Sequence, residues 1–174
     1  MGAIMSKQIV PFSGKMPTID LGVFLAPGAR LVGDVKIEQG SSVYYNAVVR
    51  ADLAPVRIGA RTNIQDNATI HVSAKCGVTI GDEVTIGHGA ILHGCTIEEG
   101  CTVGMGAIIM DGSRIRKNSI VGAGALVTSD KDFPEGSLIL GSPATFIREL
   151  TEEELRISHE TTINYANLVR GLDG

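Results

Sequence analysis

Aliphatic residues recur every six positions along most of this chain, and this repeat constrains the fold more than any other feature. The repeat positions are Leu25, Leu31, Ile37, Val43, Val49, Ile58, Ile64, Ile70, Ile80, Ile86, Leu92, Ile97, Val103, Ile109, Ile115, Val121 and Val127. A small side chain almost always follows four residues later, as at Ala29, Ala47, Ala90 and Ala107. A period of six matches neither an α-helix nor an alternating strand. It is typical of a β-helix in which each unit forms one short strand and one turn.

The repeat predicts the fold class and the domain boundaries. Three units make one triangular coil of about 18 residues, and coils stack at a strand spacing of about 4.8 Å. Aromatic residues make up only 4% of the chain, so the core has to come from stacked aliphatic side chains. We therefore expect an all-β solenoid, a left-handed parallel β-helix over residues 19–148, after an N-terminal extension over residues 1–18.

The end of the chain carries helix signals. The stretch at 140–144 resembles a final partial coil, and Thr151 with Glu154 forms the pattern of a capping box. Apolar and small residues then continue at helical spacing, at Leu155, Thr162, Tyr165, Ala166, Val169 and Leu172. We expect a helix over about 152–170, within a C-terminal region of residues 149–174, that packs one stripe on the solenoid.

Composition and charge narrow the classes of partner. The net charge is −4 and the basic residues are scattered, so no nucleic-acid partner is predicted. No apolar run approaches the ~20 residues of a membrane span, so no membrane partner is predicted either. The three cysteines are odd in number and have no CxxC spacing, which favours a reducing, cytoplasmic compartment. Cys101 falls at an inward position and is expected to be a small buried residue.

Three irregularities interrupt the six-residue period near the histidines. Three extra residues lie between Val49 and Ile58, four lie between Ile70 and Ile80, and one residue is missing between Leu92 and Ile97. Insertions in solenoids tend to map to one face, often the binding face. We therefore expect inserted loops close to the functional site.

The repeat predicts where the histidines lie. His71 and His93 each directly follow a repeat residue, and they are one full coil apart. They should therefore lie side by side on one face, with Arg50 at the same position one coil below His71. His88 follows Ile86 by two residues, so it belongs to the preceding face, above Asp66.

Hexapeptide prisms of this kind pack side by side as trimers. In such a homotrimer, His88 of one chain can face His71 and His93 of its neighbour. Three neutral imidazoles with an open fourth position are the ligand set of a catalytic zinc. Cobalt or ferrous iron suits the same ligands. A single histidine is more often a surface group, and His159 on the expected helix is interpreted in that way.

Polar residues cluster on the coils below the histidines. Arg50 with Asp52 or Asp66 is interpreted as an ion pair between subunits that fixes the trimer. Asn63 and Gln65 are better candidates for holding a metal-bound hydroxide or a substrate, because a neutral amide orients a ligand without deprotonating it.

These residues resemble the γ-class carbonic anhydrases and their bacterial homologues, over about residues 19–165. The matching motifs are Arg50-Ala-Asp52, Thr62-Asn-Ile-Gln-Asp66, His71, His88-Gly-Ala-Ile-Leu-His93-Gly-Cys95, Gly104-Met-Gly106-Ala and Gly141-Ser-Pro-Ala144. The resemblance implies that His71, His88 and His93 bind the metal, that Asn63 and Gln65 line the site, that Arg50, Asp52 and Asp66 form the interface network, and that Tyr165 approaches the substrate.

The activity implied by the resemblance is the reversible hydration of CO2 to bicarbonate by a metal-bound hydroxide. One departure bears on turnover. The founding branch of the family carries glutamates that relay protons to solvent, whereas this chain has Leu53 and a loop at 72–81 without any acid. Regeneration of the hydroxide would then depend on buffer or on another group.

Three other functions stay open at this point. They are a metal-dependent hydrolase of CoA thioesters, a hexapeptide acyltransferase, and a catalytically weak structural homologue. An acyltransferase is expected to use a lone interface histidine as its base, and not three histidines on stacked coils.

Overall fold

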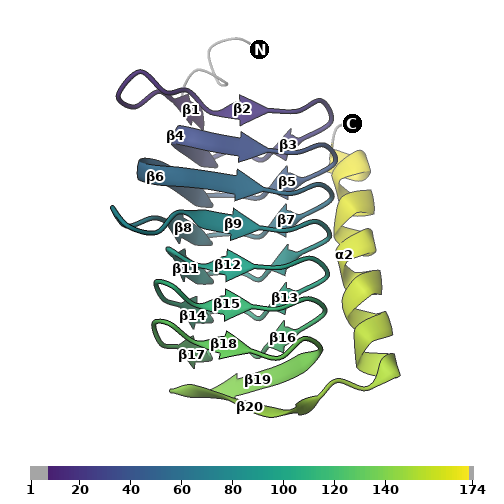
Figure 1. The fold of residues 1–174 in the computed structure, drawn as a ribbon. Coiled ribbons are helices and arrows are strands. Elements are labelled where there is room, and N and C mark those ends of the chain that lie inside the picture. The colour runs from purple at the N-terminus through teal and green to yellow at the C-terminus, as the bar shows by residue number, and fades with distance from the viewer. Residues whose placement is uncertain (1–7, 173–174) are drawn as a thin grey trace.

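A computed structural model describes residues 8–172 of the chain. The described residues form a triangular stack of parallel strands, with one long helix lying along one side (Figure 1). The strands form one hydrogen-bonded sheet of 12 strands and another of 8 strands. The predicted fold class, a hexapeptide-repeat β-helix with a C-terminal helix, is confirmed.

The prism has three faces, to which we give names. The histidine face contains β1 (Ile9–Val10), the first parts of β4 (Arg30–Ile37) and β6 (Val48–Ile58), β8 (Thr69–His71), β11 (Ile91–His93), β14 (Ile108–Ile109) and β17 (Leu126–Val127). The charged face contains β2 (Thr18–Ile19), the later parts of β4 and β6, β9 (Val78–Ile80), β12 (Thr96–Ile97), β15 (Arg114–Ile115) and β18 (Asp132–Phe133). The helix face contains β3 (Phe24–Leu25), β5 (Ser42–Val43), β7 (Asn63–Ile64), β10 (Thr85–Ile86), β13 (Thr102–Val103), β16 (Ile120–Val121), β19 (Ser137–Gly141) and β20 (Ala144–Glu149).

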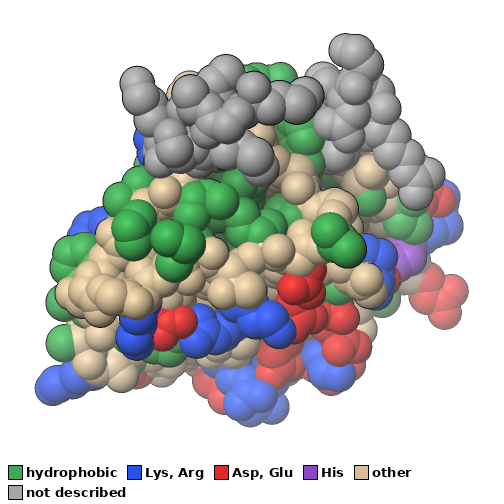
Figure 2. Space-filling view, turned by 90° about the horizontal axis from the view of Figure 1, so that it is seen from above, with side chains coloured by type: hydrophobic (Ala, Val, Ile, Leu, Met, Phe, Trp, Pro, Cys, Tyr) green, Lys and Arg blue, Asp and Glu red, His purple; other side chains and the backbone are tan. Residues whose placement is uncertain are grey.

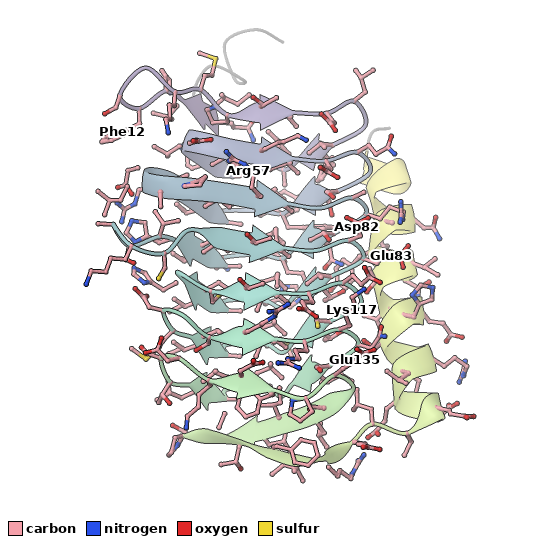
Figure 3. The ribbon with its side chains drawn as sticks, in the orientation of Figure 1. Phe12, Arg57, Asp82, Glu83, Lys117 and Glu135 are labelled. Atoms are coloured by element: carbon pink, nitrogen blue, oxygen red, sulfur yellow. The ribbon has the colours of Figure 1, made fainter. Side chains whose placement is uncertain are left out.

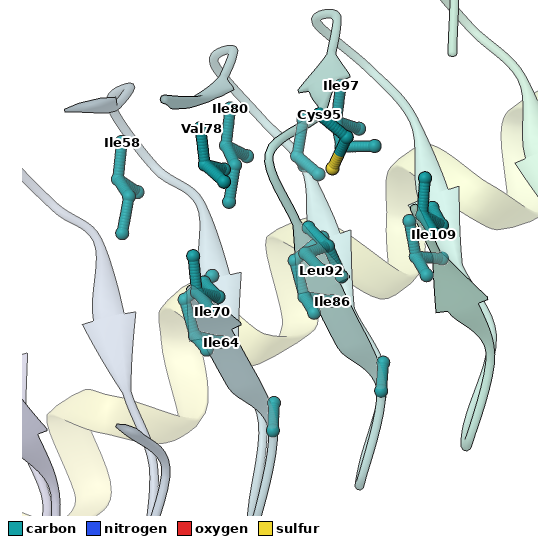
Figure 4. Close-up of a cluster of buried hydrophobic side chains, with 14 of the residues drawn as sticks. Ile58, Ile64, Ile70, Val78, Ile80, Ile86, Leu92, Cys95, Ile97 and Ile109 are labelled. Atoms are coloured by element: carbon teal, nitrogen blue, oxygen red, sulfur yellow. The ribbon is translucent and has the colours of Figure 1, made fainter. Parts of the chain in front are cut away.

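The repeat residues form the core, as the period of six predicts. Ile64 pairs with Ile86, and Ile86 pairs in turn with Val103. These side chains are fully buried, and those of the three faces converge inside the coils (Figure 4). The small residues four positions on, such as Ala90, are buried at the corners. Cys101 is also fully buried, as expected, and burial raises the pKa of its thiol to about 12.

Gly104 and Gly106 belong to the coil. A Cβ on Gly104 would lie 2.5 Å from the backbone nitrogen of Ala123 in the next coil, where no flexible side chain could give way. Gly106 has a φ of +65°, the left-handed conformation that this corner of each coil requires. Both glycines are therefore explained by the packing of successive coils.

All three irregularities fall at one corner, between the histidine face and the charged face. The four extra residues form a short loop after His71, closed by a hydrogen bond of 3.0 Å from Ser73 N to Cys76 O. The three extra residues near Ala54 do not form the expected loop. They extend β6 around the corner as one continuous strand, because Val56 pairs with Val35 of the equally continuous β4.

The two ends of the solenoid differ from expectation. Strand β1, inside the predicted extension at 1–18, already pairs with β4 through Ile9 and Leu31. At the other end, 140–144 is not a partial coil, because the chain reverses and β20 runs antiparallel to β19. Gly141 has a φ of +104° at the reversal, and Pro143 has no N–H to donate to a further coil.

Helix α2 (Glu152–Leu172) covers the helix face and runs back along the stack (Figure 1). Its predicted capping box is present, since Thr151 N donates to Glu154 Oε2 at 2.9 Å and Glu154 N donates to Thr151 Oγ1 at 3.2 Å. The middle of its docking face is polar, where Ser158 and Thr162 are buried. No helix among residues 8–172 is long and apolar enough to cross a membrane.

Lysines, arginines and acidic residues gather along one side of the prism when it is viewed from above (Figure 2). On the charged face they form ion pairs between neighbouring coils. Arg57, labelled in Figure 3, pairs with Asp34 at 2.8 Å. Arg116 pairs with Asp132 at the same distance. Exposed pairs of this kind contribute at most about 1 kcal/mol each, so the aliphatic core dominates stability.

Candidate metal centre

His71 and His93 lie side by side on the histidine face. They are directly paired residues of β8 and β11, and Arg50 of β6 is paired with His71 from the other side. The predicted column of Arg50, His71 and His93 is therefore confirmed. Nδ1 of His71 lies 3.1 Å from Nε2 of His93, and the ring centroids are 5.0 Å apart.

A carboxylate accepts a hydrogen bond from the other nitrogen of each ring. Asp52 accepts from His71 Nε2 at 3.0 Å, and Asp111 accepts from His93 Nδ1. Burial opposes the ionisation of Asp52, but the hydrogen bonds from His71 and Arg50 outweigh it and hold its pKa below the usual range. Hydrogen bonds from His93 and Ser73 lower the pKa of Asp111. Both acids are therefore ionised acceptors at neutral pH.

This arrangement fits a metal ion between the two rings. When each ring gives its N–H to a carboxylate, the two facing nitrogens can present their lone pairs to one metal ion. Two nitrogens that each bind a tetrahedral zinc at about 2.1 Å are roughly 3.4 Å apart. The observed separation is 3.1 Å. A carboxylate on the far nitrogen is also the usual support of a metal-binding histidine.

His88 lies at a different place in the chain, at the corner between the helix face and the histidine face. Its Nδ1 lies 2.8 Å from Asp66 Oδ2, and its Nε2 lies 3.4 Å from the hydroxyl of Tyr165. No three His, Cys, Asp or Glu side chains converge as a metal site within residues 8–172 of one chain. A single chain thus presents a histidine pair and a separate single histidine.

Tyr165 lies beside His88 and packs against Tyr44. The Tyr44 hydroxyl donates to the backbone oxygen of Tyr165 at 3.2 Å, and the two rings meet edge to face with centroids 5.6 Å apart. Burial raises the pKa of both hydroxyls, so both are protonated donors at neutral pH. Tyr165, which was expected near the substrate, is held next to His88 by this packing.

Some of the other predicted polar residues lie near the histidine pair, and the rest lie near His88. Arg50 pairs with Asp52 in its own chain, whereas Asp66 pairs with His88. Gln65 precedes Asp66 and is buried, and its Nε2 donates to Asn63 Oδ1 at 3.1 Å. Asn63 lies behind Gln65, where it also contacts Thr85. The ion pair between subunits stays a prediction.

Sequence reasoning missed Asp111, which contacts His93 from the next coil. It also missed the hydroxyls of Thr85, Ser158 and Thr162 under α2. The signal for Asp111 was present, because it is the acidic residue in the turn that follows the repeat residue one coil above His93. The hydroxyls gave no signal, because Thr85 and Thr162 are 77 residues apart and meet only when the helix docks.

A separate hollow of about 470 Å³ lies along the other edge of α2. Asp82 and Glu83 lie at this edge (Figure 3). In its lining, Glu83 pairs with Arg61 at 2.8 Å and lies 3.6 Å from His159. The candidate site is the histidine pair, whose rings face each other and are each held by a carboxylate.

Comparisons with known proteins agree with the fold. Residues 94–129 match the family described as "Bacterial transferase hexapeptide (six repeats)", and residues 55–93 match "Hexapeptide repeat of succinyl-transferase". A solved structure of a hexapeptide transferase family protein from Anaplasma phagocytophilum superposes with a TM-score of 0.92 at 41% identity, covering 96% of this chain and 99% of that one.

Two curated relatives identify the family more narrowly. The mitochondrial gamma carbonic anhydrase 1 of Arabidopsis thaliana is 46% identical over 162 residues, which cover 90% of this chain and 59% of that protein. This chain therefore spans little more than half the length of the plant relative. A probable carbonic anhydrase of Methanocaldococcus jannaschii is 48% identical over 155 residues, which cover 89% of this chain and 98% of that protein. The chain belongs to the γ-class carbonic anhydrase family of hexapeptide-repeat proteins.

Proposed function

We propose that this protein hydrates CO2 reversibly at metal sites between the subunits of a homotrimer. His71 and His93 of one chain and His88 of the next would hold the metal at each site. The observation that carries the proposal is the 3.1 Å separation between Nδ1 of His71 and Nε2 of His93. The other nitrogen of each of these rings is hydrogen-bonded to a carboxylate. Relatives named carbonic anhydrases, at identities up to 48%, support the choice of reaction.

Zinc suits three imidazoles best, and cobalt or ferrous iron would fit the same ligands. When bound, the metal would act as a Lewis acid that lowers the pKa of water to near 7. The chain's own residues prepare the site. Asp52 and Asp111 hold the ring protons away from the metal side, while Gln65 and Tyr165 offer polar groups on the His88 side.

The surface beside the histidine pair supports the trimer. Ile91, Ile108 and Met110 project from the histidine face, and each is at least 36% exposed. Met105 is exposed in the turn one coil beyond His88. A contiguous apolar surface of this kind is typical of a protein interface. In the proposed trimer this face meets the His88 corner of the next chain, where Arg50, Asp52 and Asp66 complete the contact.

The route of the released proton distinguishes this chain from the founding branch of the family. Leu53 is 60% exposed, and the loop that follows His71 presents Ser73 and Cys76 instead of carboxylates. Without a carboxylate relay, we expect the proton to pass to dissolved buffer. The rate of CO2 hydration should therefore rise with buffer concentration at constant pH.

The proposal is tested by metal analysis together with a stopped-flow assay of CO2 hydration. Protein reconstituted separately with zinc, cobalt and ferrous iron would be assayed over a range of pH and buffer concentration. We expect one metal per chain and a rate that increases with buffer. Background rates with all three metals would contradict the anhydrase activity, even if the metal binds.

A transferase or hydrolase of acyl-CoA is the second candidate, because the superposed Anaplasma protein is described as a hexapeptide transferase family protein. The same preparations would be incubated with acetyl-CoA, alone and with amine or alcohol acceptors. Release of CoA without CO2 hydration would favour this candidate. Neither activity, with metal still bound, would favour a structural homologue.

A further inference from the structure

A one-way chain of buried hydrogen bonds joins Gln65 to helix α2. Gln65 Nε2 donates to Asn63 Oδ1 at 3.1 Å, and Asn63 Nδ2 donates to Thr85 Oγ1 at 2.9 Å. The hydroxyls of Thr85 and Thr162 are 2.9 Å apart, and Thr162 Oγ1 lies 3.3 Å from the backbone oxygen of Ser158. The side chains of Gln65, Asn63, Thr85 and Thr162 are all buried.

The direction of each hydrogen bond follows from its neighbours. A carbonyl oxygen can only accept, so Thr162 gives its hydrogen to Ser158 O. The hydrogen between the two threonines therefore comes from Thr85. Because Asn63 donates to Thr85 through its amide nitrogen, its amide oxygen faces Gln65 and fixes the nitrogen of Gln65 as the donor. Every donor thus points from Gln65 toward α2.

With the hydrogen bonds in this direction, the amide oxygen of Gln65 stays available to accept a hydrogen bond. Its amide nitrogen is used by Asn63, and its amide oxygen makes no hydrogen bond among the described residues. No fully buried side-chain nitrogen or oxygen in that part of the chain lacks a partner, so this oxygen keeps access to solvent. Gln65 directly precedes Asp66, whose carboxylate holds His88.

We propose that Thr85 and Thr162 are positioning residues that orient the amide of Gln65 with its oxygen presented as an acceptor at the His88 side of the site. Docking of α2 and the orientation of Gln65 would then depend on the same hydrogen bonds. Tyr165 follows Thr162 on the same helix and places its hydroxyl 3.4 Å from His88 Nε2. The use of this oxygen to orient the attacking water rests on the proposed function.

The test removes one hydroxyl of the hydrogen-bond chain at a time and compares it with the removal of another hydroxyl under the same helix. In Thr85→Val, Asn63 loses its acceptor, and in Thr162→Val, Thr85 loses its acceptor. The control is Ser158→Ala, which removes a hydroxyl pair of 2.6 Å with Thr102 under the same helix but does not touch the chain to Gln65. Thr85→Ser and Thr162→Ser keep the hydroxyls and should restore wild-type behaviour.

The first readout is NMR of the side-chain amide groups of Gln65 and Asn63, which requires neither metal nor activity. We expect hydrogen exchange of the Gln65 amide to become at least about 10-fold faster in both valine variants, and to be unchanged in Ser158→Ala and in the serine variants. Unchanged exchange in Thr85→Val would overturn the proposal. An equal increase in Ser158→Ala would also overturn it, because it would mean that helix docking alone protects Gln65.

The second readout separates positioning from metal binding. In Thr85→Val we expect kcat for CO2 hydration to fall about 10-fold, with KM and metal affinity unchanged, because Gln65 is not a ligand. A wild-type kcat in a variant whose amide exchange has increased would overturn the functional part of the inference. If the wild-type protein hydrates no CO2, the proposed function fails, while the amide exchange still decides the positioning role.

Discussion

Each residue of the histidine pair has one nitrogen committed to an acid and one presented to its neighbour. Asp52 fixes the proton on Nε2 of His71, and Asp111 fixes it on Nδ1 of His93. An imidazole that kept its proton on the facing side could not bind a metal there. The two carboxylates therefore determine which nitrogen of each ring is available, before any metal arrives.

Replacing Asp111 with alanine should weaken metal binding without disturbing the coil. The variant leaves the His93 N–H without its acceptor, so we expect metal affinity to fall on the order of 10–100-fold. Asp111→Asn keeps a neutral acceptor, so its metal affinity should lie between those of the wild type and Asp111→Ala. Competition with a colorimetric zinc chelator would measure the affinities. The matched control is Asp132→Ala, whose carboxylate pairs with Arg116 on the charged face. Equal affinities in Asp111→Ala and in the wild type would contradict the role of Asp111.

Replacing His88 with alanine should remove the metal while the trimer persists. The coil at this position depends on Ile86 and Ala90, which are fully buried and unchanged in the variant. Metal per chain would be measured on protein whose mass is confirmed by sedimentation. His159→Ala is the matched control, since it removes a histidine of α2 that pairs with Glu83 and lies away from the proposed ligands. Metal content that stays at the wild-type level in His88→Ala would show that the ligand set is wrong.

At the scale of the element, α2 begins at a closed capping box. Two hydrogen bonds of 2.8 Å from Arg148, together with the bonds from Thr151, lower the pKa of Glu154 to about 2. Its ordinary value is 4.5. Because the folded pKa lies below the unfolded one, the contribution of Glu154 to stability is complete above about pH 4.5 and is lost as the pH falls toward 2.

Glu154→Gln should therefore make stability less dependent on pH in the acid range. The wild type and the variant would be unfolded in urea at several pH values between 4.5 and 2, and followed by circular dichroism. We expect the wild-type midpoint to fall more steeply than that of Glu154→Gln. Glu152→Gln, in the same first turn, is the control and should keep the wild-type slope. Parallel slopes for all three proteins would mean that the capping carboxylate does not stabilise the folded state.

The elements that the sequence predicted well are those that repeat. The period of six determined the register of Ile64, Ile86 and Val103, and the same counting placed His93 beside His71. Nothing repeats at the final hairpin, where the chain reverses at Gly141 and Pro143. The contacts under α2 also lie outside any period, since hydroxyls from distant segments meet there. Sequence could therefore predict which histidines share a face, but not the hydroxyls that meet under α2.

At the scale of the whole molecule, the three faces of the prism have different surroundings. The charged face carries ion pairs between its side chains, and α2 covers the helix face (Figures 1 and 2). The histidine face keeps Ile91, Ile108 and Met110 exposed. Ion pairs and α2 therefore cover two of the three faces within one chain, whereas the third keeps apolar side chains exposed.

If the metal lies between chains, two defective variants should restore each other. His88→Ala keeps the histidine pair, whereas the double variant His71→Ala/His93→Ala keeps only His88. Each homotrimer should bind no metal. By the three-fold symmetry of a closed ring, every mixed trimer contains one interface where an intact pair meets an intact His88, so about one third of the sites should be complete.

The two variants would be produced together with different affinity tags, and mixed trimers would be purified through both tags in succession. We expect about one metal ion per mixed trimer. Two differently tagged His88→Ala chains, produced and purified in the same way, are the control and should bind none. Mixed trimers without metal would place all three ligands in one chain, or exclude the site altogether. Recovery of metal only in the mixed trimers would mean that this chain binds its metal as an assembly, because one subunit supplies the carboxylate-supported pair and its neighbour supplies the third imidazole.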